Sequence, residues 1–425
     1  MRTGAISIKV IGGILAVWAG IVSLPVQATA QDNSAVARDA RVGGDLKRTR
    51  FVADLSDTVE FRAFLLADPH RVIVDLPKVQ FLMPPGVGEK GRGLINAFRY
   101  GLFAKGKSRI VIDTVGPVVI DKAFVRPAEN GQPARLVIDL IKASEQEFEE
   151  QRQRQALLRA VKPETDQVSI NGSVDSSTAN ADSGKPVIVL DPGHGGPDPG
   201  TVTGGSVYEK DVVLAFCKEL KAALEATGRF RVLMTREEDI FVPLGARVDF
   251  ARQAQANLML SVHADALDIK HPLVTKKMIQ EVRGASVYTL SEEASDALAN
   301  VIATRENNSD VLAGVELPPS ADGSLASILI DLMHRETKNL SIAFAKQLLN
   351  GLAQHTPLTK TPHRYADFRV LKAEDVPSVL LELGFLSNPN DETALTSEEW
   401  RSNVAKAITE SIGAFFEQRL VSVPG

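Results

Sequence analysis

The chain has 425 residues, enough for two or three domains, and its 44% hydrophobic content is sufficient for ordinary globular cores. The formal net charge of −5 argues against a nucleic acid partner, because phosphate binding requires a basic surface. The single cysteine, Cys217, excludes an intrachain disulfide. Because it falls on the apolar face of a predicted helix, we interpret it as a small buried hydrophobe.

The first thirty residues have the pattern of a secretory signal peptide. Two basic residues precede an uncharged run from Val10 to Ala30, and Ala28-Thr-Ala30 is a small-residue cleavage site. The run is nearly long enough to act instead as an uncleaved membrane anchor. Pro25 interrupts its end, which favours cleavage over residues 1–30, export, and no stable membrane span in the mature protein.

Residues 36–145 contain a near-repeat of four apolar runs, each beginning with Arg and closing on Asp. The runs are Arg50–Leu55, Arg71–Leu76, Arg109–Thr114 and Arg135–Leu140. Short strands, intervening turns and the absence of a convincing helical pattern predict an all-β sandwich. We expect the four Asp side chains to face solvent. Since no cluster of His, Cys or paired carboxylates accompanies the strands, this domain is interpreted as a binding module.

The composition changes over residues 146–184. The first part, Glu145–Lys162, is charged and rich in Gln and is compatible with a solvated helix, whereas Ser, Asn, Asp and Gly dominate Asp166–Gly184. Such a composition is typical of a flexible tether. We therefore expect the first domain to move freely relative to the second.

Residues 185–420 alternate between strand and helix patterns, which predicts an α/β domain with a mostly parallel sheet flanked by helices. The predicted strands are Val187–Leu190, Arg229–Thr235, Leu258–Val262, Gly284–Leu290 and Ser378–Leu383, and the clearest helices are Lys210–Ala226, Leu244–Ala256 and Trp400–Phe416.

Two histidines lie just beyond two of these strands. His194 follows the first strand on a glycine-rich loop, and His263 follows the third. The carboxyl ends of parallel strands are where open α/β sheets place ligands. Together with Glu209, these residues make a three-ligand zinc site with an open fourth position, where a bound water becomes nucleophilic near neutral pH.

Glu382 lies within an apolar run near the end of the fifth strand, where an unpaired carboxylate is costly to bury. We assign it as the general base, its pKa raised by burial. Asp265 is expected to orient His263, and Asp191 either to orient His194 or to cap a turn. Taken singly, each residue has an ordinary alternative: loop histidines, a surface Glu209, or a Glu382 paired with Arg247.

Four motifs in order resemble the zinc N-acetylmuramoyl-L-alanine amidases of bacterial cell separation: Asp191–Gly196, Glu209, Ser261–Asp265 and Glu382–Asn388. The resemblance implies that His194, Glu209 and His263 bind Zn²⁺ and that Glu382 is catalytic. It implies cleavage of the amide between the lactyl group of N-acetylmuramic acid and L-alanine. Arg236 and Arg247 match the family pattern too, and we expect them to pair with local carboxylates.

The first domain, 36–145, resembles the AMIN domain found ahead of such amidases. In that family it targets the enzyme to peptidoglycan and the division site. The resemblance therefore implies a periplasmic enzyme of the Gram-negative envelope, with peptidoglycan as its substrate.

Residues 291–352 form an insert longer than one crossover helix requires. One interpretation is packing, since Ile342, Ala345 and Leu349 share an apolar helical face. The other follows from the resemblance: family members use such an insert as an autoinhibitory helix whose glutamate fills the open zinc position until a LytM-domain activator displaces it. The candidates are Glu292, Glu293 and Glu306. A helix over 291–305, with Ser291 as its N-cap, is predicted to carry Glu292 and Glu293 in its first turn and to end just before Glu306.

The sequence thus predicts an exported zinc amidase, with two alternatives. One is a zinc peptidase that cuts stem-peptide bonds, and the other is a catalytically inactive peptidoglycan-binding protein. The presence of His194, Glu209, His263 and Glu382 together disfavours the inactive binder, which has no use for the set.

Overall fold

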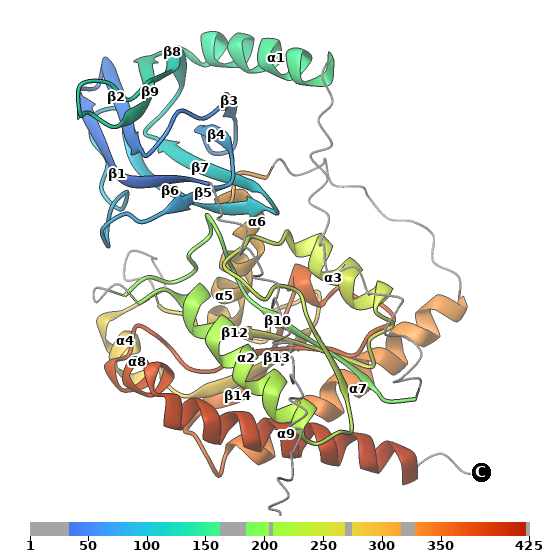
Figure 1. Cartoon of the computed structure of the whole chain (residues 1–425). Coiled ribbons are helices and arrows are strands. Elements are labelled where there is room, and N and C mark those ends of the chain that lie inside the picture. Colours follow the sequence, from blue (N-terminus) through green and yellow to red (C-terminus); the bar gives the residue numbers. More distant parts are fainter. Residues whose placement is uncertain (1–33, 162–183, 204–206, 268–273, 316–327, 422–425) are drawn as a thin grey trace, which may run out of the picture. The chain divides into compact units, whose positions relative to one another are not determined.

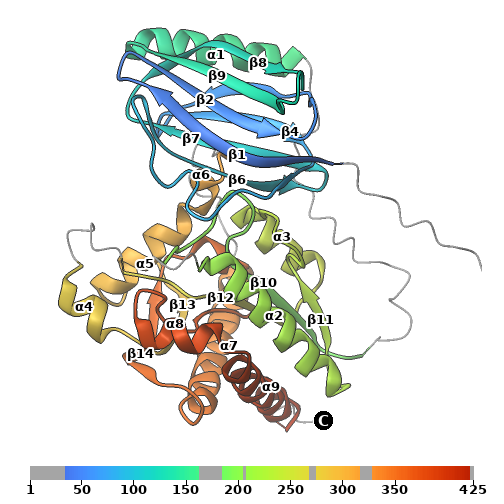
Figure 2. The same ribbon diagram turned by 60° about the vertical axis from the view of Figure 1, so that its left-hand side comes forward.

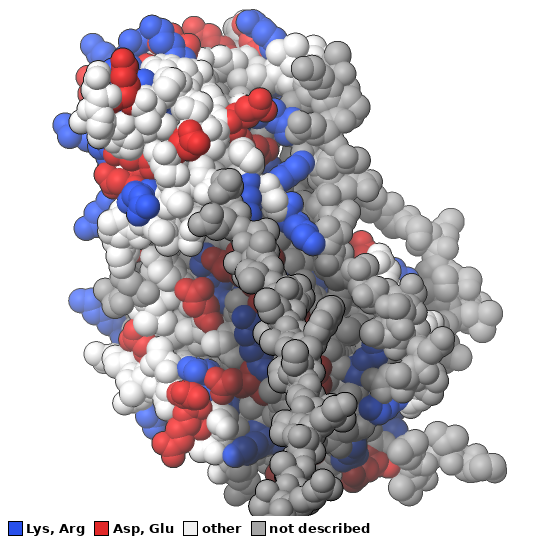
Figure 3. Space-filling model, viewed as in Figure 1, with Lys and Arg blue, Asp and Glu red and all other residues white. Residues whose placement is uncertain are grey.

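The computed structural model describes residues 34–161, 184–203, 207–267, 274–315 and 328–421. These residues belong to a single compact unit, Ser34–Gly425, so the expected signal peptide lies outside them. Within the described ranges, no helix combines the length and the hydropathy needed to cross a bilayer. On the face drawn in Figure 3, acidic and basic side chains are interspersed over the described surface, in keeping with the small net charge.

The amino-terminal domain is a sandwich of two sheets, antiparallel except for the parallel pairing of β1 with β5 (Figure 2). One sheet has the order β5-β1-β2-β9-β8, from Val79–Phe81, Ala35–Gly44, Arg48–Leu55, Ala134–Lys142 and Val118–Arg126. The other has the order β3-β4-β7-β6, from Arg62–Leu66, Arg71–Pro77, Lys107–Thr114 and Ile95–Ala104. A shared apolar core between the sheets includes Phe51, Val72, Phe98 and Ile112. The predicted all-β sandwich is confirmed.

Residues of the near-repeat form Arg–Asp ion pairs between neighbouring strands, which the order of the runs in the sequence does not reveal. Arg50 of β2 stands opposite Asp139 of β9, and Asp75 of β4 stands opposite Arg109 of β7. In these two pairs the Arg meets the Asp of another run in the same sheet, with Nε–Oδ1 distances of 2.6 Å in both. Arg71 differs, because it donates to backbone oxygens such as Pro69 O at 3.1 Å. The expectation that all four Asp face solvent is wrong, since Asp139 is only 2% exposed.

Helix α1 (Glu145–Val161) packs on this sandwich (Figure 1). Phe148 is fully buried in the core. The Gln151 amide exchanges two hydrogen bonds with the backbone of Ile120, at 2.8 and 3.0 Å, and Leu65 N–H donates to Gln155 Oε1 at 2.9 Å. The linker therefore begins after α1, later than its composition suggested. Helix α1 belongs to the sandwich because its glutamine side chains form hydrogen bonds with backbone groups of strands β3 and β8.

The carboxy-terminal domain is an α/β layer structure with a six-stranded sheet. Its order is β11-β10-β12-β15-β13-β14, formed by Arg231–Met234, Val187–Pro192, Leu258–His263, Ser378–Glu382, Ala285–Leu290 and Leu358–Ala366. Only the β13–β15 pairing is antiparallel among these strands. The mostly parallel sheet is thus confirmed, and β14, a largely polar edge strand, is the strand that the hydrophobic pattern missed.

Helices cover both faces of the sheet. One face carries α2 (Glu209–Ala226), α7 (Ile328–Leu352) and α9 (Glu398–Val421), which share an apolar core with the strands. Cys217 of α2 is fully buried there, and burial raises the pKa of its thiol, as expected for a packing residue. The other face carries α3 (Leu244–Gln253), α5 (Ala297–Asn307) and the short helix η1 (Arg369–Leu371). Three shorter helices complete the described part: α4 (Lys276–Glu281), α6 (Ser309–Leu312) and α8 (Pro389–Thr396).

The insert divides into two parts. Ser291 extends the strand pairing, donating its N–H to Ala366 O at 3.1 Å, so it is not the predicted N-cap. Helix α5 begins only after Asp296, whose carboxylate accepts the Ala299 N–H at 2.8 Å. Glu292 and Glu293 stay exposed ahead of that helix. The later part, α7, packs on the sheet through residues such as Ala345 and Leu349, as the packing interpretation expected.

Candidate metal centre

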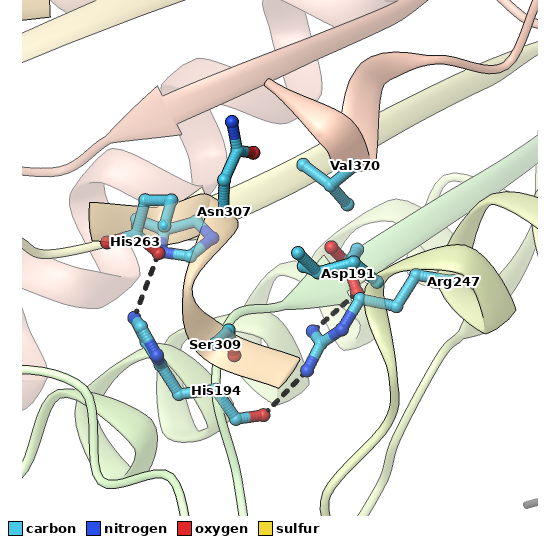
Figure 4. Close-up of a pocket in the computed structure, with 9 residues that line it drawn as sticks. Asp191, His194, Arg247, His263, Asn307, Ser309 and Val370 are labelled. Atoms are coloured by element: carbon cyan, nitrogen blue, oxygen red, sulfur yellow. Dashed lines mark hydrogen bonds and ion pairs between the residues drawn. The ribbon is translucent and has the colours of Figure 1, made fainter. Parts of the chain in front are cut away.

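The two predicted histidines meet at the carboxyl ends of neighbouring strands. His263 is the last residue of β12, and His194 lies two residues beyond β10, which pairs with β12 in parallel. Their ring centroids are 4.9 Å apart. Figure 4 shows both rings directed into one small cavity. Sheet topology therefore brings together two residues that are almost 70 positions apart.

Glu209, the first residue of α2, completes the predicted set. Its Oε1 lies 3.2 Å from His194 Nε2 and 3.3 Å from His263 Nδ1. Backbone N–H groups hold this fully buried carboxylate: Thr201 N–H donates to Oε2 and Ala264 N–H to Oε1, each at 2.9 Å. The side chain is thus fixed by its surroundings before any ion binds.

The glycines of the loop are required by the close approach of these rings. A Cβ at Gly193 would lie 2.3 Å from Cε1 of His263, and one at Gly200 would lie 2.6 Å from Cδ2 of His194. His194 itself has a φ of +59°, in the left-handed region. Arg247 stabilises that turn by donating from Nη2 to His194 O at 2.8 Å.

Asp191 anchors the loop from below and does not touch the imidazole ring of His194. Its carboxylate accepts from Thr235 Oγ1 at 2.6 Å, Ser261 Oγ at 2.7 Å and Arg247 Nη1 at 2.8 Å. Arg247 therefore pairs with a carboxylate as expected, and with Asp191 rather than Glu382. Arg236 differs from the expectation, because it donates mainly to backbone oxygens, including Pro192 O at 3.0 Å and Gly193 O at 2.7 Å.

The residue that orients His194 is Asp198, which sequence reasoning did not identify. Its Oδ2 lies 2.9 Å from His194 Nδ1, and Oδ1 accepts the Gly200 N–H at 3.1 Å. Asp198 is fully buried, and the His194 ring holds its pKa below the usual range despite that burial. Its position four residues after His194, on the same glycine-rich loop, was the available signal.

Glu382 lies beside the histidines at the end of β15, in register with His263. Its Oε2 accepts the Asp265 N–H at 3.0 Å, whereas Oε1 has no hydrogen-bond partner in the described part of the chain. Burial, reinforced by the nearby Asp265 carboxylate, raises its pKa well above the ordinary range. This environment favours the protonated carboxyl group more than water does, which suits a group that must take up and release a proton.

Asp265 has a different neighbour from the one expected. Its Oδ1 accepts the Ala266 N–H at 2.6 Å and a hydrogen bond from Arg305 Nη1, and among the described residues it makes no hydrogen bond to the His263 ring. Burial raises the pKa of Asp265 to about 6, although Arg305 opposes the shift. The expected orientation of His263 by this side chain is therefore not seen. Asp265 instead forms an ion pair with Arg305 of the insert.

The structure brings one of the three candidate glutamates to the histidines. Glu306 Oε2 lies 3.2 Å from His194 Nε2 and 3.0 Å from His263 Nδ1, and the side chain is 3% exposed. The ligand atoms of His194, His263 and Glu306 all lie within 4.8 Å of one another. Burial disfavours a charged His263, yet the Glu306 and Glu209 carboxylates raise its pKa to about 10.

Residues on either side of Glu306 close the site. Arg305 donates to Asp265 and to Thr201 Oγ1, and Ser309 donates to Asp198, the partner of His194. The cavity that remains beside the two histidines measures about 10 Å³, room for roughly one water molecule. Figure 4 shows Asn307 and Ser309 flanking it. Within the described part of the chain, Glu306 and its neighbours therefore enclose the two histidines.

Two family models and several curated relatives match this chain. A family described as N-acetylmuramoyl-L-alanine amidase matches residues 188–414, and the AMIN domain family matches residues 39–132. N-acetylmuramoyl-L-alanine amidase AmiC of Escherichia coli O6:H1 is 32% identical over 379 residues, 87% of this chain and 86% of that protein. AmiC of Neisseria meningitidis serogroup B is 32% identical over 383 residues, 88% of each chain. Among solved structures, AmiC2 of Nostoc punctiforme aligns with a TM-score of 0.39 at 27% identity, covering 55% of this chain and 98% of that one.

Proposed function

This chain belongs to the N-acetylmuramoyl-L-alanine amidase family, and from that premise we propose that it is a zinc-dependent enzyme held inactive by its own Glu306. Peptidoglycan is the substrate of the family, and the relatives of AmiC type are consistent with a role in cell separation. The match selects amidase activity over the two alternatives raised by the sequence, a stem-peptide peptidase and an inactive wall binder.

The observation that carries the zinc assignment is the convergence of four buried donor groups from four segments. His194, Glu209 and His263 would hold the ion, with Glu306 in the remaining position. His194 Nε2 has no hydrogen-bond partner within the described ranges, although carboxylate oxygens lie 3.2 Å away. Two imidazoles and a carboxylate suit Zn²⁺, with one position left for water once Glu306 withdraws.

A bound Zn²⁺ would supply an acidified water and polarise the substrate carbonyl. Glu382 supplies the proton transfers. Its free Oε1 accepts a proton from the attacking water, whose oxygen bonds to the lactyl carbonyl carbon. The same carboxyl group then gives that proton to the L-alanine nitrogen as the C–N bond breaks. The Asp265 N–H on Oε2 keeps Oε1 aimed at the reacting atoms throughout.

Glu306 supports autoinhibition because it occupies the side of the histidines that a substrate needs. The plug, which we define as residues 305–315, enters through Arg305, Glu306 and Ser309 and leaves only the water-sized cavity. Activation then requires the plug to leave. A protein of the LytM-domain class is the activator that we propose, and a periplasmic location follows from the AMIN domain and the expected signal peptide.

Metal content and product analysis test the enzyme assignment together. Purified wild type is expected to contain one zinc per chain, and His263→Ala to lose it, whereas exposed His355→Ala retains it. Glu382→Gln is expected to keep zinc and to lose release of dye from labelled sacculi by about 10²–10⁴-fold. Exposed Glu410→Gln is the matched control.

Digested sacculi should yield intact stem peptides with a free L-alanine amine. Cuts within the stem peptide would contradict the amidase assignment. A Glu382→Gln variant of unchanged activity would remove the assigned base, and zinc retained by His263→Ala would remove the assigned ligand set.

A further inference from the structure

The AMIN domain contacts the same segment that blocks the metal centre. Residues 309–315 lead away from the histidines to the outer face of the β3-β4-β7-β6 sheet, where Arg99 of β6 donates to Leu312 O. Contacts join this segment to three strands of that sheet. Hydrogen bonds therefore join the two domains, a contact that the composition of the linker did not predict.

Three arginines make the polar half of this contact, and all three donate to backbone oxygens at the end of the plug. Arg71 Nη1 donates to Val311 O, Arg99 Nε to Leu312 O at 2.6 Å, and Arg109 Nη1 to Gly314 O at 2.8 Å. Carbonyl groups at the end of a helical segment lack partners within the helix, and they favour cations. The arginines provide both hydrogen-bond donors and positive charge to these carbonyl groups.

The guanidinium groups are positioned by the sheet itself. Arg99 Nη2 is 3.0 Å from Asp113 Oδ1, and Arg109 Nε is 2.6 Å from Asp75 Oδ1. Burial and the neighbouring Arg99 lower the pKa of Arg71 to about 10, so grouping these cations is costly without acceptors. The plug carbonyls reduce that cost, and the site is therefore built to receive them.

An apolar contact completes the interface. Ile73 and Val111 lie on the outward face of the sheet yet are fully buried, together with Phe64 and Leu66. Gly314 covers them so closely that a Cβ there would lie 2.6 Å from Ile73 Cδ1. The plug therefore covers part of this apolar cluster at Gly314.

A second contact reaches the loop that carries His194. Phe241 N–H donates to Leu102 O at 3.0 Å, and the rings of Phe103 and Phe241 stack at 6.0 Å. A Cβ on Gly101 would lie 2.3 Å from Gly196 C, two residues after His194. Strand β6 thus touches the plug at one point and the metal-binding loop at another.

We propose that the AMIN domain is a latch on the plug: its arginine-bearing sheet holds residues 309–315, so that detaching this domain frees Glu306 from the histidines. The inference rests on the autoinhibition proposed above. It implies that whatever draws the AMIN domain away, such as peptidoglycan binding, promotes activation. Binding of peptidoglycan by the AMIN domain would then both localise the enzyme and favour its activation.

Gly314→Val in the full mature chain tests the latch without altering either domain core. The new side chain meets Ile73, and the φ of +72° disfavours it further. We expect basal dye release to rise about five- to tenfold, with faster amide hydrogen exchange over 305–315. The matched control is Gly131→Val, which has a φ of +75° and nothing within 4 Å. It should leave both readouts unchanged.

Arg99→Ala is a second route to the same result, and it serves if Gly314→Val does not fold. The outcomes separate the two proposals. Release increased by Glu306→Gln but by neither latch variant would overturn the latch alone. No increase from Glu306→Gln would overturn autoinhibition, while faster exchange in Gly314→Val alone would still support the docking contact. Unchanged exchange over 305–315 in both latch variants would reject that contact.

Discussion

The two parts of the insert bury different kinds of side chain, apolar in α7 and largely polar or charged in α5 and α6. Helix α7 places Phe344, Leu348 and Leu352 in the apolar core beside α9, and Phe344 stacks edge-on against Phe415 with centroids 5.2 Å apart. Helices α5 and α6 bury Glu306, Ser309 and Asp310 instead, each with a polar or charged partner. One part belongs to the fold, and the other covers a site.

The two parts also differ in the surface that their withdrawal would expose to solvent. Withdrawal of α7 would expose a continuous apolar surface, at a cost of roughly 25 cal/mol per Å². Withdrawal of α5 and α6 would expose polar groups that water, zinc or substrate can satisfy. The apolar contacts of α5, through Ala299, Ile302 and Ala303, are few by comparison. A detachable cover requires such a composition, so we expect α5 and α6 to have a different role from α7.

The largest effect is expected from Phe344→Ala in α7. Removing a fully buried aromatic ring costs about 3–5 kcal/mol, because the cavity left behind only partly collapses. Chemical denaturation should show this loss together with reduced dye release. A variant that is equally destabilised but more active would place α7 in the switch and end the distinction between the two parts.

A smaller effect of opposite sign is expected from Glu306→Gln in α5. The amide keeps the shape but loses the charge that the two histidines attract, and a hydrogen bond to a charged group is worth roughly 1.5–3 kcal/mol. Basal dye release should rise about tenfold or more, with the denaturation midpoint nearly unchanged. The matched control is exposed Glu293→Gln, which should behave as wild type. Equal activity of both variants would count against the plug.

A milder change in α5 sharpens the comparison. Ile302→Val removes one buried methylene, which costs about 1 kcal/mol. If α5 detaches as a unit, that loss should appear as an increase of about fivefold in basal release, not as lower global stability. The comparison of dye release with denaturation midpoint decides between the two. A lowered midpoint with unchanged release would make α5 part of the core.

The smallest effect concerns pH. Burial raises the pKa of Asp310, although Leu244 N–H and Arg369 oppose the shift. Since the docked pKa exceeds the free value, docking is favoured below the free pKa, and this contribution is lost as pH rises through the docked pKa. Asp310→Asn removes this titration. The ratio of hydrogen-exchange rates over 305–315, variant to wild type, should therefore change between pH 4 and pH 7. A constant ratio would show that Asp310 does not titrate on docking.

The residues at the metal centre illustrate how far sequence reasoning extends. His194, Glu209, His263 and Glu382 stand at strand ends or in glycine-rich loops, where local pattern and motif order identify them. Asp198 was missed because an Asp after Gly-Gly-Pro is indistinguishable from a turn residue. Glu306 was one of three candidates. The choice among them depended on where α5 begins, and Asp296 sets that start.

The sequence by itself determined the order of the domains, the sandwich and the α/β layer, and the chemistry of the donor set. The period of the hydrophobic pattern and the residue types are local properties, so they can be recognised from the sequence alone. Tertiary structure alone decided which Arg meets which Asp across the sandwich, and which half of the insert is core. It also decided that the plug ends on the AMIN domain, because contacts between positions more than 200 residues apart leave no periodic signal in the chain.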